Sequence, residues 1–138
     1  MIYTHQVKFR TRGDGEIVDL TAHLAQAIDK SGASAGMLTV CTTGSTAGLT
    51  TIEFEPGLIK DVPELMQKLV PRGTQYHHDA TWGDGNGYAH LRSALIGTSF
   101  VVSFSDKSPH LGTWQQVVFL DFDNRSRDRT VVIQVMGE

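Results

Sequence analysis

Ser99-Phe100-Val101-Val102-Ser103-Phe104-Ser105 opens the part of the sequence that decides the fold. Two further segments, Gln116 to Asp123 and Arg129 to Met136, are also rich in Val, Ile and Phe, which are typical strand residues. Asn124 to Asp128 forms a polar hairpin turn between these two segments. Strands joined by a tight turn pair antiparallel, so the C-terminal region predicts a largely antiparallel sheet.

Upstream of residue 99, strand patterns and helix patterns alternate. Residues 2–10, 36–41 and 49–55 carry the β-branched and aromatic residues expected of strands. A first helix is expected with Asp19 as its cap and Gly32 just beyond its end.

A second and a third helix are expected between residues 61 and 97. Asp61-Val62-Pro63-Glu64 is typical of a helix start, and the third helix covers residues 88–96 with Asn86 as its cap. Leu91, Leu95 and Ile96 are expected to face the core. Six or more strands with about three helices predict an α+β fold, built as one domain over residues 1–138.

Composition excludes several classes of protein. The chain has 138 residues, of which 40% are hydrophobic and 20% charged, and its net charge is −3. Proteins that bind nucleic acid usually carry a basic surface, so this function is not expected. Cys41 is the only cysteine, which rules out an internal disulfide. With no signal-peptide pattern at residues 1–6 and no segment long enough to span a bilayer, a cytoplasmic protein is expected.

The stretch from Tyr76 to Leu91 holds the residues best suited to chemistry. It contains three of the six histidines, two aspartates, an asparagine and several glycines, with few apolar residues to pack it. Imidazole and carboxylate groups serve both metal binding and proton transfer. Histidines at a surface or a helix cap are the alternative.

Thr42 to Gly48 forms a loop of small hydroxyl-bearing residues. Such a loop can offer backbone N–H groups and hydroxyls to a phosphate. It lacks the lysine and the spacing of a P-loop, so it is no nucleotide-binding motif. A tight connection between two strands explains it equally well.

Three motifs follow one another downstream of residue 83: Asp84-x-Asn86-x-x-Ala89-His90-Leu91, Ser93-Ala94-Leu95-Ile96-Gly97-Thr98-Ser99 and Leu111-Gly112-Thr113-Trp114-Gln115-Gln116. Together they resemble the YjbQ-like family, whose members are described as secondary thiamine-phosphate synthases or as proteins of unknown function. The resemblance extends from the Ser45-Thr46 loop to Gly137-Glu138, so it covers most of the chain.

The resemblance implies an α+β subunit in a homotrimer, with a divalent metal or a small anion in a pocket. His78 and His90 match the two recurrent histidines of the family and are the expected ligands of the metal, for which zinc is the first choice. Asp84, Asn86 and Glu53 are the expected catalytic residues. The expected contacts to a small phosphorylated metabolite are Ser45, Thr46, Thr113, Gln115, Arg127 and Arg129.

One position departs from the family pattern. Many members have His-Thr-Ser in the loop where this chain has Gly44-Ser45-Thr46. If that histidine binds metal or acts in catalysis, another group must replace it, and His77, Cys41 and Glu53 are the candidates. Two functions therefore stay open: an enzyme that forms thiamine phosphate with the help of a metal, and a non-catalytic trimer that binds a metal, a phosphate or a metabolite.

Overall fold

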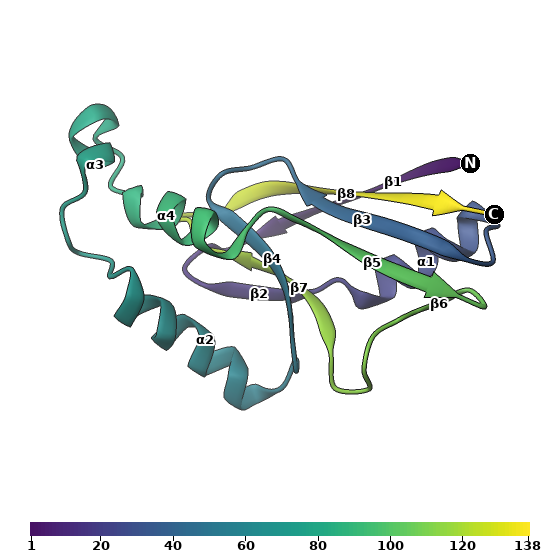
Figure 1. Ribbon diagram of the computed structural model, residues 1–138. Coiled ribbons are helices and arrows are strands. Elements are labelled where there is room, and N and C mark those ends of the chain that lie inside the picture. The colour runs from purple at the N-terminus through teal and green to yellow at the C-terminus, as the bar shows by residue number, and fades with distance from the viewer.

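Two antiparallel sheets form the frame of the molecule (Figure 1). The computed structural model describes residues 1–138. The first sheet has five strands in the order β1 (Ile2–Thr11), β8 (Arg127–Gly137), β3 (Gly36–Thr42), β5 (Ser99–Ser105) and β6 (Ser108–Pro109). The second has three strands in the order β2 (Glu16–Asp19), β7 (Gln116–Asp121) and β4 (Ala47–Ile52).

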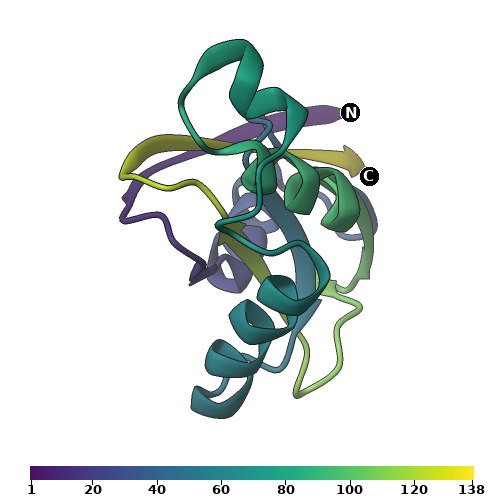
Figure 2. The ribbon, with the colours of Figure 1, turned by 90° about the vertical axis from the view of Figure 1, so that its left-hand side faces the viewer.

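Four helices complete the fold: α1 (Thr21–Ser31), α2 (Pro56–Leu69), α3 (His77–Trp82) and α4 (Gly87–Ile96). Helix α1 packs on β1 and β8, whereas α4 packs on β4. Figure 2 views the molecule from the side that carries α2, α3 and α4. None of the four helices has both the length and the apolar character needed to cross a membrane.

Strand β7 is buried on both faces and separates two cores. Val117 and Phe119 point into the larger core, which lies between the sheets and α1. Val118, Leu120 and Phe122 point into a smaller core with Met66 of α2 and Ala89 of α4. A strand covered on both faces is apolar at nearly every position, which explains the run from Val117 to Phe122.

The α+β class with antiparallel sheets is confirmed, but the expected hairpin of β7 and β8 is wrong, because the two strands lie in different sheets. Three short elements, β2, β6 and α3, were not predicted, and β6 has only two residues. Strand β2 has only four residues, and its first and last residues are acidic. The sequence therefore shows no clear strand pattern there. Helix α3 has six residues, none of them buried, so it shows no helical period of apolar residues.

The predicted start of the second helix is wrong. Helix α2 begins at Pro56, because the Glu55 carboxylate accepts hydrogen bonds from the N–H groups of Gly57 and Leu58. Asp61 and Pro63 therefore lie inside the helix. An acceptor side chain with a proline shortly after it is typical of a helix start. This pattern occurs at Glu55 as well as at Asp61, so it does not distinguish the two positions.

The predicted core face of the third helix is right for Ile96, which packs against the smaller core, and wrong for Leu91 and Leu95. Helix α4 follows Asn86 as expected, yet the Asn86 side chain makes no capping hydrogen bond. Leu91 and Leu95 are 49% and 57% exposed. The buried face of the helix carries Ala89 and Ser93 instead, and the buried Ser93 hydroxyl donates a 2.5 Å hydrogen bond to the carbonyl of Ala47.

Candidate functional site

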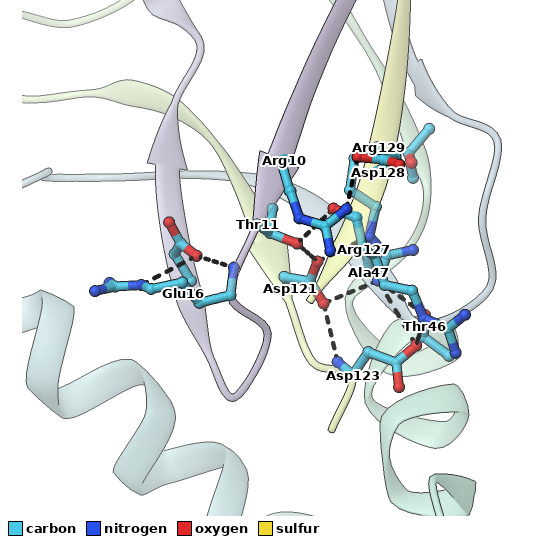
Figure 3. Close-up of polar contacts among 12 residues, drawn as sticks. Arg10, Thr11, Glu16, Thr46, Ala47, Asp121, Asp123, Arg127, Asp128 and Arg129 are labelled. Carbon is cyan, nitrogen blue, oxygen red and sulfur yellow. Dashed lines mark hydrogen bonds and ion pairs between the residues drawn. The ribbon is translucent and has the colours of Figure 1, made fainter. Parts of the chain in front are cut away.

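The end of β7 and the start of β8 hold a buried ion pair. Arg129 donates from Nε to Asp121 Oδ2 and from Nη2 to Asp121 Oδ1, both at 2.8 Å. The two side chains are 8% and 0% exposed. A buried pair is favourable only with good geometry and further hydrogen bonds, and here the Thr11 hydroxyl also donates to Asp121 (Figure 3). The pair forms a rigid, neutral floor for the site.

Asp123 lies beside this floor and accepts four hydrogen bonds. The donors are Thr46 Oγ1 at 3.0 Å, Asn86 Nδ2 at 3.3 Å, the Asn124 amide at 2.8 Å and Arg127 Nε at 2.8 Å. Burial alone would raise the pKa of Asp123, but the hydrogen bonds outweigh it and hold the pKa below its ordinary value. Asp123 is therefore a fixed anion that positions its neighbours.

Thr46 joins the two aspartates into one network. Its hydroxyl donates to Asp123 and accepts from Arg129 Nη2 at 2.9 Å, and the residue is only 6% exposed. Figure 3 shows these contacts converging where β4 leaves the Ser45-Thr46 loop. The loop thus anchors the floor through Thr46, whereas Ser45 is exposed.

A pocket of about 410 Å³ lies above this network. Its nine lining residues are all polar: Ser45, Thr46, Asp84, Asn86, His90, Asp123, Arg127, Asp128 and Arg129. Asn86 is 3% exposed, and its Oδ1 atom has no hydrogen-bond partner within the protein. The pocket therefore suits a small, polar, charged ligand that brings at least one hydrogen-bond donor.

His90 faces the pocket from α4 and stacks on His78 of α3. The ring centroids are 4.4 Å apart and the planes are tilted by 40°. His78 Nδ1 is buried without a hydrogen bond, and lies 3.7 Å from Asp79 Oδ1 and 3.9 Å from Asp84 Oδ1. The Gly87 amide donates to Asp79 at 2.9 Å, which lowers the pKa of that carboxyl. The imidazole of His78 thus lies beside His90 and two carboxylates near one edge of the pocket.

These residues do not fit the usual zinc site. Zinc at a catalytic site takes three protein ligands and a water, but no group of three His, Cys, Asp or Glu side chains gathers around one point. Zinc on His78 and His90 stays a prediction, which elemental analysis of the wild type beside His90→Ala tests.

Comparison with known proteins identifies the family. The model of the UPF0047 protein YjbQ-like family matches residues 5–138. The chain belongs to the YjbQ-like family. A UPF0047 protein of Archaeoglobus fulgidus is 36% identical over 131 residues, which cover 95% of this chain and 99% of the relative. The UPF0047 protein YugU of Bacillus subtilis is 30% identical over 99% of this chain and 100% of its own.

Solved structures share the fold over its whole length. A hypothetical protein from Aeropyrum pernix K1 is 30% identical, with a TM-score of 0.91 over 99% of both chains. An uncharacterised YjbQ-like protein from Clostridium acetobutylicum is 31% identical, with a TM-score of 0.87 over 96% of this chain and 99% of its own. None of these names states a reaction, and three of the four state the family.

Gly44, the departure from the YjbQ-like pattern, lies against the ion pair. A Cβ atom at this position would be 3.0 Å from Arg129 Nη1, so the arginine lies where a side chain at residue 44 would begin. The three suggested substitutes for the missing histidine, His77, Cys41 and Glu53, do not line the pocket.

Seven of the predicted site residues line the pocket and four do not. Those inside are Ser45, Thr46, Asp84, Asn86, His90, Arg127 and Arg129. His78 adjoins it through His90. Glu53, Thr113 and Gln115 lie at the other end of the three-stranded sheet, since Ala47 pairs with Asp121 near the pocket and Ile52 pairs with Gln116 far from it.

Sequence reasoning missed Asp121, Asp123 and Asp128. The first two stand in an otherwise apolar strand segment, Val117 to Asp123. Carboxylates in such a segment are almost never fully buried without a partner, so their position was a usable signal. Their arginine partners lie only four and eight residues downstream.

Proposed function

We propose that this YjbQ-like protein is an enzyme that binds a small phosphorylated metabolite in the 410 Å³ pocket and acts on it by proton transfer. One observation carries the proposal: the pocket has no apolar lining residue. The charged groups of the buried floor pair with one another. A few groups around the pocket remain available to bind a ligand. These groups belong to His90, Asp84 and Arg127.

Arg127 supplies the phosphate contact. Its Nε atom is held by Asp123 at 2.8 Å, so the guanidinium is fixed while its two terminal nitrogens stay free for a ligand. A guanidinium presents paired N–H donors that match a phosphate. The exposed Ser45 hydroxyl lies on the same pocket wall and adds a further donor.

His90 is the proposed acid or base. Histidine serves this role most often, because it exchanges protons near neutral pH. His90 contacts His78, and the Nδ1 atom of His78 lies close to Asp84 and Asp79. Asn86 Oδ1 has no partner within the protein and can accept a hydrogen bond from the ligand.

The reaction implied by the family resemblance joins hydroxymethylpyrimidine diphosphate to thiazole phosphate and releases diphosphate. In this pocket Arg127 would hold a phosphate group, and His90 would protonate the leaving oxygen. Such contacts stabilise charge that develops on a leaving group. The expected activity is therefore that of a thiamine-phosphate synthase-like transferase, with thiamine phosphate formation as a secondary activity.

A non-catalytic binding protein is the second candidate, and the saturated network of Asp121, Asp123 and Arg129 favours it. An assay of thiamine phosphate formation separates the two. We expect turnover by the wild type, a fall of about 10²-fold or more in His90→Gln, and weaker substrate binding in Arg127→Ala. Binding without turnover would support the non-catalytic candidate. A wild type that neither binds nor reacts would contradict both.

A homotrimer is also proposed, and the outer face of the five-stranded sheet is its expected interface. Ile2, Met136 and Met37 are neighbours across β1, β8 and β3, and they are 64%, 52% and 47% exposed. Val101 on β5 is 59% exposed. Contiguous exposed apolar side chains mark interaction surfaces, and the trimer follows the family resemblance.

A further inference from the structure

Arg92 is a buried cation without a counter-ion. It lies on α4, is 6% exposed, and takes part in none of the ion pairs of the chain. Its Nε donates to the Val70 carbonyl and its Nη2 to Gln67 Oε1, both at 3.0 Å. Burial lowers the pKa of Arg92. A buried charge without a partner is unfavourable. An anion bound beside Arg92 would therefore stabilise its guanidinium.

Tyr88, one turn earlier on α4, adds an unused donor. The residue is 3% exposed, and its hydroxyl has no hydrogen-bond partner within the protein. Burial raises the pKa of Tyr88, so the hydroxyl keeps its proton and can donate. The guanidinium carbons of Arg92 and Arg72 lie 4.9 and 5.4 Å from the centroid of its ring. Two cations and one free hydroxyl therefore gather here.

A pocket of about 190 Å³ opens among these groups. It is lined by Asp14, Pro63, Gln67, Arg72, Tyr88 and Arg92. At roughly 30 Å³ for each water, this volume equals about six waters and accommodates a tetrahedral oxyanion. Asp14 is the only carboxylate of the lining, so two guanidinium groups and one carboxylate leave a net positive charge.

Asp14 does not neutralise Arg92. It pairs with Arg72, and the two side chains are 56% and 50% exposed. An exposed pair of this kind contributes little stability, so Arg72 can share its guanidinium with a second anion at low cost. Gln67 holds both arginines in place, since its Oε1 accepts from Arg92 Nη2 and from the Arg72 amide.

We propose that this pocket is a second binding site, specific for a small oxyanion such as inorganic phosphate or the phosphate group of a metabolite. Arg92 and Arg72 provide the positive charge, and the Tyr88 hydroxyl donates the orienting hydrogen bond. The site is distinct from the 410 Å³ pocket, because Tyr88 and Arg92 share one face of α4 while Asn86 and His90 share another.

Titration of the full chain with inorganic phosphate, followed by backbone amide NMR and by calorimetry, tests the site. We expect saturable shifts at residues 67–73 and 88–92. Tyr88→Phe keeps the ring and loses one hydrogen bond to a charged group, so the Kd should rise about tenfold. Arg92→Met should abolish binding at these residues. Arg125→Met, which removes an exposed arginine elsewhere, should bind as the wild type does.

Thermal unfolding gives an independent readout, because a ligand that binds only the folded state raises the Tm. Phosphate should raise the Tm of the wild type and of Arg125→Met more than that of Tyr88→Phe. Tyr88→Phe removes a hydroxyl that has no partner, so this variant folds and carries the test even if Arg92→Met does not. No saturable shift at residues 67–73 and 88–92 in the wild type, or equal phosphate affinity in the wild type and Tyr88→Phe, would overturn the proposal.

Discussion

Asp123 shows how single residues hold the pocket together. Its carboxylate accepts from two side chains that line the pocket, Thr46 and Asn86, and from Arg127, the proposed phosphate contact. Because Arg127 depends on this carboxylate for its position, the charge of Asp123 matters for ligand binding as well as for folding. The proposed contacts of the ligand itself are Arg127 and His90.

Asp123→Asn should lower the free energy of unfolding and make it less dependent on pH. The pKa of Asp123 is lowered in the folded state, so its contribution is fully present above its ordinary pKa of about 3.9 and is lost as the pH falls through the lowered value. We expect the variant to lose about 1–3 kcal/mol at pH 7. Urea unfolding at pH 7 and at pH 3 measures both effects.

Below pH 4 the difference between the wild type and Asp123→Asn should narrow, because the carboxyl of the unfolded wild type takes up a proton there, and that of the folded state does so only at lower pH. A difference that stays constant between pH 7 and pH 2 would contradict the assigned role of Asp123. Asp128→Asn is the control, since Asp128 is an 85% exposed partner of Arg10 and such pairs contribute little.

A site residue could be predicted only where the residues that it contacts lie close to it in the sequence. His90, Asp84 and Asn86 belong to one polar stretch that burial does not explain, so the sequence alone points to them. The use of Thr46 as an anchor depends on Asp123, which lies 77 residues away. Tyr88 and Arg92 were not predicted, because their pocket needs Gln67 and Asp14 from distant parts of the chain.

Secondary structure was predictable where the local pattern was strong. The strand at Gln116 to Asp121 is apolar at nearly every position, because both its faces are covered. Helix α4 was predicted nearly in full, but its orientation was not. Ala89 and Ser93 are buried where Leu91 and Leu95 were expected to be, and the Ser93 hydroxyl bonds to the carbonyl of Ala47 across the contact with β4.

The contact between α4 and β4 should not tolerate a larger residue at Gly48. A Cβ atom there would be 2.7 Å from Ile96 Cγ2 and 2.9 Å from Ile96 Cβ. Gly48→Ala should therefore push the helix away from the strand and cost about 1–3 kcal/mol. Chemical denaturation measures the loss, and amide shifts around His90 report the displacement of the helix.

Gly112→Ala is the matched control for Gly48→Ala. A Cβ atom at Gly112 would meet Gln115 Cβ at 3.7 Å, which is an ordinary contact. The control should therefore unfold like the wild type. If Gly48→Ala were equally stable, the packing of α4 on β4 would be looser than described.

For the whole molecule, we expect the proposed homotrimer to assemble through the outer face of the five-stranded sheet. Size-exclusion chromatography with light scattering should give three times the 15.1 kDa subunit mass. Met37→Glu places a charge among exposed apolar side chains, so it should shift the mass toward that of one subunit. Lys60→Glu, an exposed change on α2, should leave the mass unchanged. A trimer that survives Met37→Glu would require another interface.

The polar pocket above Asp121 and Asp123 is proposed to bind a phosphorylated metabolite. A titration of the isotope-labelled protein with thiazole phosphate, observed residue by residue through backbone amide shifts, tests this most directly. We expect saturable shifts at residues 44–46, 84–90 and 123–128, and their loss in Arg127→Ala. Shifts confined to residues 67–73 and 88–92, or no saturable shift anywhere, would contradict the proposal.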